Sequence, residues 1–289
     1  MIIVTGQTAT GKTKLALEYA KKYHGELINF DSRQVYKYLD IITGKDWEEI
    51  SKIKNQSSKI WLYDIIKPNE YFSSFDFVQR VIPIIQDIKK RGKTPILVGG
   101  TYLYLKHLIY GFADYNCPPD FRLRKKLNDK PVDYLQKMLI KINKASFENL
   151  NHSDQLNPRR LIRRIEIEQF KQSHLKNPPI SPMSLISPIS HFTGLRYKDK
   201  NKLRQAIENR VGERLKNGAV DEVKKILAMG YTKNDPGLKT IGYQQIIKYL
   251  NKELTREQAI KDWVNKEVQY SKRQLTFMKK DKNIKWKEI

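Results

Sequence analysis

The residues with the most specific chemistry lie close to the amino end and match a phosphate-binding pattern in full. The pattern G-x-x-x-x-G-K-[ST] is formed by Gly6, Gln7, Thr8, Ala9, Thr10, Gly11, Lys12 and Thr13. Its glycines allow backbone N–H groups to approach a phosphate chain, while the start of the following helix adds positive potential and Lys12 adds a charge. The Thr13 hydroxyl is a suitable Mg²⁺ ligand. This P-loop predicts binding of a diphosphate or polyphosphate, without indicating which of them.

Two further polar residues follow apolar runs that we expect to be strands. Asp31 comes after the run at 27–30, and Thr101 comes after the run at 94–98 and two glycines. Because the carboxyl ends of strands line the ligand crevice of an open parallel sheet, both side chains are candidates for the site. Asp31 is then a general base facing a second substrate, or a metal ligand. The alternative for both residues is that they cap the helices that follow.

The elements that position these residues alternate between strand and helix. Strands are expected at 2–5, 27–30, 60–64 and 94–98, and helices at 14–20, 75–90 and 102–108. This alternation predicts an α/β fold with a doubly wound parallel sheet. At the carboxyl end, the apolar spacing of residues 203–215 and 259–268 predicts two long helices, and residues 255–258 have the spacing of a capping box.

The alternating pattern stops near residue 115. Cys117, Pro118 and Pro119 mark a break, residues 121–175 are typical of charged helices, and prolines interrupt residues 178–190, which leave room for a short strand. We therefore predict an all-helical lobe at 115–177, inserted between residues 1–114 and 178–289 of the α/β core.

The net charge, the single cysteine and the lack of a long apolar run limit the classes to which the protein can belong. The 289 residues include 55 Lys and Arg against 31 Asp and Glu, a net charge of +24, and all of this excess lies beyond residue 50. Such asymmetry favours a polyanionic partner, although a solvated lysine-rich surface is the alternative. The lone cysteine excludes an internal disulfide. No apolar run is long enough to span a membrane and no secretory leader is recognisable, so we expect a soluble cytoplasmic protein with no membrane partner.

Several blocks, in this order, resemble the bacterial tRNA dimethylallyltransferase family. They are the P-loop, Asp-Ser-Arg-Gln-Val-Tyr at 31–36, Gly-Gly-Thr-Tyr-Leu-Tyr at 99–104, Pro-Arg-Arg-Leu-Ile-Arg at 158–163, Arg-Val-Gly-Glu-Arg-Leu at 210–215, Ile-Gly-Tyr-Gln-Gln at 241–245 and Lys-Arg-Gln-Leu-Thr-Phe at 272–277. The sequence departs from the usual family pattern at Gln7, Thr10, residues 42–46, Trp61 and Phe277. The resemblance covers nearly the whole chain.

The resemblance implies a P-loop NTPase-like fold and transfer of a dimethylallyl group from dimethylallyl diphosphate to adenosine 37 in the anticodon stem-loop of tRNA. By this likeness Asp31 is the general base and Thr101 hydrogen-bonds in the same site, while Lys12, Thr8, Thr13 and Arg210 hold the diphosphate and Mg²⁺. The implied tRNA contacts are Asp31, Ser32, Arg33, Gln34, Arg159, Arg160, Leu161, Ile162, Arg163, Lys239, Gly242, Tyr243, Gln244, Lys272, Arg273, Gln274, Thr276 and Phe277. A monomer is expected.

Three other functions are compatible with parts of this pattern. An adenylate isopentenyltransferase acting on free AMP, ADP or ATP would share the P-loop and Asp31, but it would not need the basic helical lobe. A small-molecule kinase would need an adenine-binding lid, and no segment is recognisable as one. A basic RNA-binding protein without activity would have no use for Gly11, Lys12, Thr13 and Asp31 together.

Overall fold

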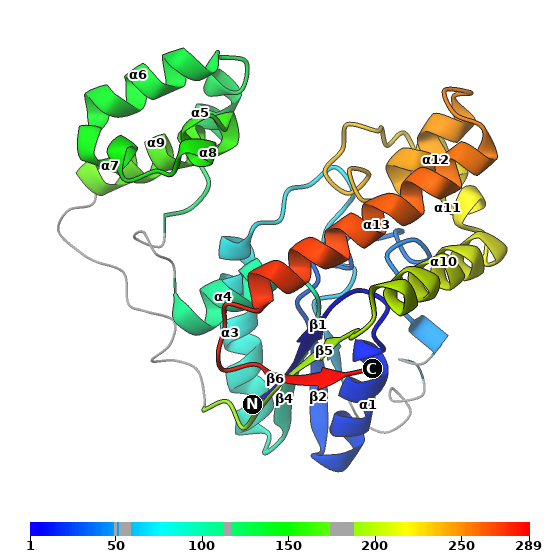
Figure 1. Cartoon of the computed structure of the whole chain (residues 1–289). Helices are drawn as coiled ribbons and strands as arrows, with labels where there is room; N and C mark the ends of the chain where they lie inside the picture. Colours follow the sequence, from blue (N-terminus) through cyan, green and yellow to red (C-terminus); the bar gives the residue numbers. More distant parts are fainter. Residues whose placement is uncertain (49–50, 52–58, 112–116, 174–187) are drawn as a thin grey trace. The chain divides into compact units, whose positions relative to one another are not determined.

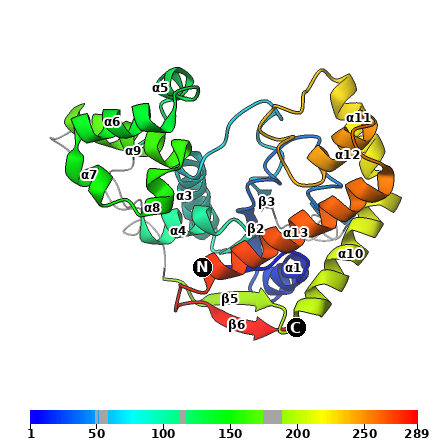
Figure 2. The same ribbon diagram turned by 45° about the horizontal axis from the view of Figure 1, so that its top comes forward.

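The computed structural model describes residues 1–48, 51, 59–111, 117–173 and 188–289 (Figures 1 and 2). The chain forms two compact units. Met1–Leu105 and Ile186–Ile289 make an α/β unit, and Lys106–Leu185 make a helical unit. No helix among the residues that the structure describes has both the length and the apolar character needed to cross a lipid bilayer.

The α/β unit is built on six parallel strands in the order β3-β2-β4-β1-β5-β6. The strands are β1 (Ile2–Gly6), β2 (Gly25–Asn29), β3 (Ile60–Trp61), β4 (Thr94–Val98), β5 (His191–Arg196) and β6 (Lys285–Glu288). The central strand β1 aligns Ile3 with Leu97 of β4 and with Phe192 of β5. The sheet confirms the predicted α/β fold.

Helices cover both faces of this sheet. α1 (Lys12–Lys22) contacts β1, β2 and β4, α3 (Ser74–Lys90) contacts β4, and α13 (Arg256–Met278) contacts β1. The helices α10 (Lys200–Lys216), α11 (Ala219–Ala228) and α12 (Tyr243–Leu250) pack with one another and with α13, and α4 (Tyr102–Tyr110) crosses the boundary between the units. Ile2 and Val4 share a buried cluster with Ala16 of α1. Thr5 points to the opposite face of β1, where its hydroxyl lies 3.3 Å from Met278 Sδ of α13. The sheet is therefore doubly wound.

The carboxyl-terminal helices pack around a second core. Leu203, Ile207 and Val211 of α10 are buried there with Trp263 of α13, as their spacing predicted. The capping box at the start of α13 is also confirmed, because Thr255 and Gln258 exchange the two expected hydrogen bonds at 2.9 and 3.2 Å. These helices bring residues 200–278 against the end of the sheet that carries the P-loop.

Three details differ from the sequence-based expectations. The strand expected at 60–64 ends at Trp61, because Leu62 and Asp64 have left-handed φ values of 65° and 54°. The short strand considered within 178–190 falls mostly outside the described residues, and 188–190 are not strand; β5 begins at His191. No strand was expected after α13, yet the edge strand β6 follows residues 279–282, and Asp281 of that segment is buried and accepts a 2.7 Å hydrogen bond from the Tyr102 hydroxyl.

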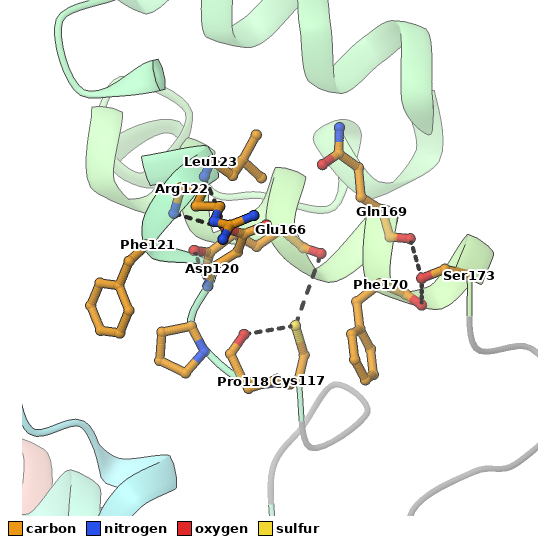
Figure 3. A pocket seen from close by; sticks show the side chains of 11 residues that line it. Cys117, Pro118, Asp120, Phe121, Arg122, Leu123, Glu166, Gln169, Phe170 and Ser173 are labelled. Carbon is orange, nitrogen blue, oxygen red and sulfur yellow. Dashed lines mark hydrogen bonds between the residues drawn. The ribbon is translucent and has the colours of Figure 1, made fainter. Parts of the chain in front are cut away.

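The helical unit has its own core. Its helices are α5 (Phe121–Leu127), α6 (Val132–Ile142), α7 (Lys144–Glu148), α8 (His152–Gln155) and α9 (Pro158–Ser173), and Leu135, Leu139, Leu161 and Ile165 are fully buried between them. A pocket of about 600 Å³ lies between the start of α5 and the end of α9. Figure 3 shows the Phe121 and Phe170 rings on either side of Cys117 and Pro118, with Glu166 behind them.

Candidate functional site

A cavity of about 830 Å³ in the α/β unit collects the polar residues singled out from the sequence. It is lined by P-loop residues Thr8–Thr13, by Asp31, Arg33 and Gln34 after β2, by the loop at 42–46, by Arg210 and Arg214 of α10, and by four residues of α13. Every lining residue belongs to the α/β unit. The cavity thus joins a phosphate-binding loop to the carboxyl ends of β2 and β4.

The P-loop is fixed in place by close backbone contacts. Gly6 has φ 136°, and a side chain there would come within 2.2 Å of the Leu195 carbonyl, so only glycine fits. Gln7 replaces the usual proline and is buried, and its side chain contacts Ser271 at 3.1 Å and the Tyr197 N–H at 3.0 Å. Gly11 begins α1 in the left-handed conformation. The loop therefore depends on β5 and α13 for its shape.

The Lys12 ammonium lies inside the P-loop and donates to the Gln7 carbonyl at 2.5 Å. Desolvation lowers the pKa of Lys12 to about 8, and the nearby Arg210 guanidinium acts in the same direction, while Asp31 and Asp46 partly oppose them. Since no carboxylate of the described residues forms an ion pair with it, this cation is available for an anionic ligand.

Two arginines of α10 extend the positive wall of the cavity. Arg210 donates to the Thr8 hydroxyl, and Arg214 forms a buried ion pair with Glu267 at 2.6 Å. Both guanidiniums lie against Gly44, where a side chain would approach their Nη2 atoms to 2.6 and 2.8 Å. The absence of a side chain at Gly44 therefore leaves room for both guanidiniums. In this position beside the P-loop, the two arginines can bind a phosphate group.

Asp31 lies at the other side of the cavity in a rigid setting. Its N–H donates to Asn29 Oδ1 at 2.8 Å, and its Oδ1 accepts from the Arg33 N–H at 2.9 Å. A side chain on Gly99 would come within 2.8 Å of the Asp31 nitrogen, so the two glycines after β4 allow β2 and β4 to end side by side. The Arg33 N–H thus fixes Oδ1 of this carboxylate, and Oδ2 lies on the side of Gly100.

Thr101 is connected to the segment that carries Asp31 through Ser32. Its hydroxyl oxygen accepts from the Ser32 N–H at 2.9 Å and lies 3.1 Å from the Ser32 hydroxyl. Tyr270 of α13 interacts with the Thr101 and Gln274 side chains, and burial raises the pKa of Tyr270 to about 12, so it stays protonated. Asp31, Ser32 and Thr101 are therefore neighbours, although 69 residues separate Ser32 from Thr101.

The predicted RNA contacts of the α/β unit divide into exposed and buried residues. Lys239, Lys272, Arg273, Thr276 and Phe277 are exposed, and Lys239 and Arg273 also line the cavity. Phe277 packs edge-on against Tyr102, with ring centroids 5.3 Å apart.

The remaining members of this set have structural contacts. Tyr243 is fully buried with its hydroxyl on Glu222, and a side chain on Gly242 would strike Ile42 at 2.5 Å. Gln244 donates to the Leu238 carbonyl at 2.7 Å. Gln34 donates to the Gly44 carbonyl at 2.6 Å, and Arg33 to Pro236 O at 3.3 Å. Any effect of Tyr243 and Gly242 on RNA is therefore indirect.

The block at 158–163 begins α9 in the helical unit. Arg159 and Arg160 are exposed, and Arg160 lies 3.7 Å from Asp154. Arg163 bonds the Cys117 carbonyl at 2.7 Å and Glu166 at 3.0 Å, while Leu161 and Ile162 are core residues. Arg159 and Arg160 thus present exposed charge to a partner, and the other three side chains hold the unit together.

Sequence reasoning missed several residues of the cavity. Asp46 and Tyr63 line it beside Asp31, and burial raises the pKa of Tyr63. Glu267 lines it as well, with Oε1 on Arg214 and Trp263, while Oε2 is buried and has no hydrogen-bond partner among the described residues. Glu267 and Tyr270 lie seven and four residues before Gln274 and so follow the helical period of that block, and this was the available signal.

Comparisons with known proteins agree on one family. A family model described as IPP transferase matches residues 34–281. The tRNA dimethylallyltransferase of Caldanaerobacter subterraneus subsp. tengcongensis is 35% identical over 99% of this chain and 90% of its own length. That of Clostridioides difficile (strain 630) is 35% identical over 100% and 91%.

Solved structures extend this likeness to the fold. The full-length tRNA isopentenylpyrophosphate transferase of Bacillus halodurans is 32% identical, with a TM-score of 0.69 over 99% of this chain and 89% of that one. A eukaryotic dimethylallyltransferase described as acting on tRNA is 24% identical, with a TM-score of 0.77 over all of this chain and 73% of its own. The second likeness concerns the fold alone.

Proposed function

The chain belongs to the IPP transferase family, and from this premise we propose that it transfers the dimethylallyl group of dimethylallyl diphosphate to the exocyclic amine of adenosine 37 in tRNA. One observation carries the proposal: the P-loop with Lys12 and Arg210 lines the same cavity as the Asp31 carboxylate, and Thr101 is bonded to Ser32, the residue after Asp31. A diphosphate donor and a base acceptor can therefore meet within it.

The chemistry assigns one role to each side of the cavity. The adenosine nitrogen forms a bond to the first carbon of the prenyl group, the bond from that carbon to diphosphate oxygen breaks, and the electron pair leaves with diphosphate. Asp31 accepts the proton released from the amine, with Oδ1 held by the Arg33 N–H and Oδ2 directed toward Gly100. Lys12, Arg210 and Arg214 stabilise the charge that develops on the diphosphate.

The residues of the cavity fit a Mg²⁺ ion carried largely by the substrate. No group of three His, Cys, Asp or Glu side chains in the described parts of the chain could hold a metal alone. Mg²⁺ prefers one or two protein ligands together with phosphate oxygens and water, and the Thr13 hydroxyl beside Lys12 would supply one ligand. Bound there, the ion would neutralise diphosphate charge as the leaving group departs.

The acceptor side of the proposal concerns RNA. The net charge of +24 and the exposed Arg159, Arg160, Lys272 and Arg273 favour a polyanion over a free nucleotide. The target base has to leave its stack to reach Asp31, which costs a few kcal/mol and is easiest in a single-stranded loop such as the anticodon loop. We place the helical unit in tRNA binding, and the enzyme in the cytoplasm as a monomer.

The proposal is tested by mass spectrometry of the transfer reaction. The enzyme receives Mg²⁺, dimethylallyl diphosphate and either an anticodon stem-loop with adenosine 3′ to the anticodon or free AMP. We expect prenylated stem-loop and unchanged AMP, with an A37-to-G stem-loop unmodified as the matched control. Prenylated AMP alone would assign the chain to free nucleotides, and consumption of ATP without any prenyl transfer would identify a kinase.

A further inference from the structure

The inner face of α13 is attached directly to the P-loop. Ser271 Oγ accepts a hydrogen bond from Gln7 Nε2 at 3.1 Å, and Gln274 Oε1 accepts one from the Thr8 N–H at 3.0 Å. Ser271 is fully buried and Gln274 is 7% exposed. Because the Thr8 N–H is engaged by Gln274, the shape of the diphosphate-binding loop depends on where α13 lies.

The same Gln274 amide also reaches the acceptor side of the cavity. Its Nε2 donates to the Gly100 carbonyl at 3.0 Å. A side chain on Gly100 would lie 2.4 Å from this Nε2 and 3.5 Å from Asp31 Oδ2, so Gly100 separates the amide from the catalytic carboxylate. One buried side chain thus connects Thr8 of the P-loop to the glycine turn beside Asp31.

The outer face of α13 carries the residues that the proposed function places against RNA. Lys272 and Thr276 are exposed and lie two positions before and after Gln274, while the exposed Arg273 also lines the cavity. A helix is a stiff element, so a force applied to its outer face by a bound phosphate backbone also moves the buried amide. The family likeness groups Gln274 with these RNA contacts, but its side chain is turned to the inside of the molecule.

We propose that Gln274 is a positioning residue that links RNA binding on the outer face of α13 to the diphosphate site. The inference rests on the proposed function, since it needs both substrates. RNA that fixes α13 also fixes Thr8, and the P-loop then meets the diphosphate in its bound shape. By linkage the diphosphate strengthens RNA binding by the same factor.

The test measures this coupling in the full-length protein. The affinity for an unreactive dimethylallyl diphosphate analogue is determined by calorimetry without and with a saturating anticodon stem-loop. We expect the stem-loop to tighten analogue binding at least about fivefold in the parent protein, in the range typical of coupled sites. In Gln274→Met, which keeps the length and volume of the side chain, this coupling factor should fall to about one.

Two further variants separate coupling from general damage. Gln269→Met is the matched control, because Gln269 is exposed on the same helix and has no place in either substrate site, and its coupling factor should equal that of the parent. Gly100→Ala displaces the Gln274 amide from the opposite side and should lower the factor as Gln274→Met does. It serves as the test if Gln274→Met fails to fold.

The outcomes distinguish this inference from the proposed function. A parent protein that modifies the stem-loop but shows a factor of one overturns the coupling and leaves the proposed function intact. If both Gln274→Met and Gly100→Ala keep the coupling factor of the parent protein, the Gln274 side chain contributes only to packing. A parent protein that neither binds nor modifies the stem-loop refutes the proposed function itself.

Discussion

The lowered pKa of Lys12 predicts that diphosphate binding weakens in mildly alkaline solution. With a pKa of about 8 in the empty site, Lys12 is protonated in about nine molecules of ten at pH 7 and in about one of ten at pH 9. A bound diphosphate raises this pKa, because it places negative charge beside the ammonium. Binding above pH 8 therefore requires uptake of a proton, and the affinity should fall about tenfold from pH 7 to pH 9.

Calorimetry with an unreactive dimethylallyl diphosphate analogue measures this dependence between pH 6.5 and 9.5. The analogue itself contributes little, since its last phosphate ionisation lies near pH 6. Lys12→Arg is the informative variant, because a guanidinium stays charged throughout and should give an affinity that does not change with pH. In Arg210→Gln the decline should begin at a higher pH, since Arg210 lowers the pKa of Lys12.

Two results would refute this reasoning. A parent protein with constant affinity between pH 7 and 9.5 would mean that burial within the P-loop does not lower the pKa of Lys12. The same decline in Lys12→Arg would mean that another group is titrating.

Three further predictions concern the base, the fold and the RNA surface. Asp31→Ala should abolish transfer and leave analogue affinity within about twofold, whereas a large loss of affinity would assign Asp31 to the metal. Glu26 is fully buried, and although burial opposes ionisation, its bonds to Arg91, Trp61 and Lys93 lower its pKa to about 2. Glu26→Gln should therefore cost up to about 3 kcal/mol at pH 7, by urea denaturation, and the difference should vanish as the pH falls from about 4.5 toward 2. Arg160→Ala should weaken stem-loop binding and lower by about one the slope of log affinity against log salt concentration. An unchanged slope would mean that Arg160 is an ordinary solvated side chain without contact to RNA.

The parts of the site that follow local rules could be predicted from the sequence. The P-loop is a contiguous pattern, and Asp31 and Thr101 each follow an apolar strand, so their meeting at one edge of a parallel sheet is a consequence of topology. The stripe at Leu203, Ile207 and Val211 is likewise a local period. These features need only the order of elements along the chain.

The side-chain roles that depend on distant partners could not be predicted. Glu222 holds the loop after β2 by accepting from the Asp40 and Ile41 N–H groups, which lie 182 and 181 residues away in sequence. Gln274 sits in a basic block with exposed neighbours, and nothing in its own segment indicates that it faces Thr8. Leu62 ends its strand through a left-handed backbone that its residue type does not favour.

The position of the helical unit within the chain has a consequence for the order of folding. Strand β1 pairs on one side with β4, but its other neighbour β5 follows only after the whole helical unit, and the P-loop packs on Leu195 of β5 and on Ser271 and Gln274 of α13. The core of the helical unit uses residues between Leu127 and Ile165 and forms from near neighbours. During synthesis the helical unit can therefore be complete while the P-loop still lacks the partners that shape it. A nascent chain that has not yet released α13 should carry a folded helical unit and no working diphosphate site.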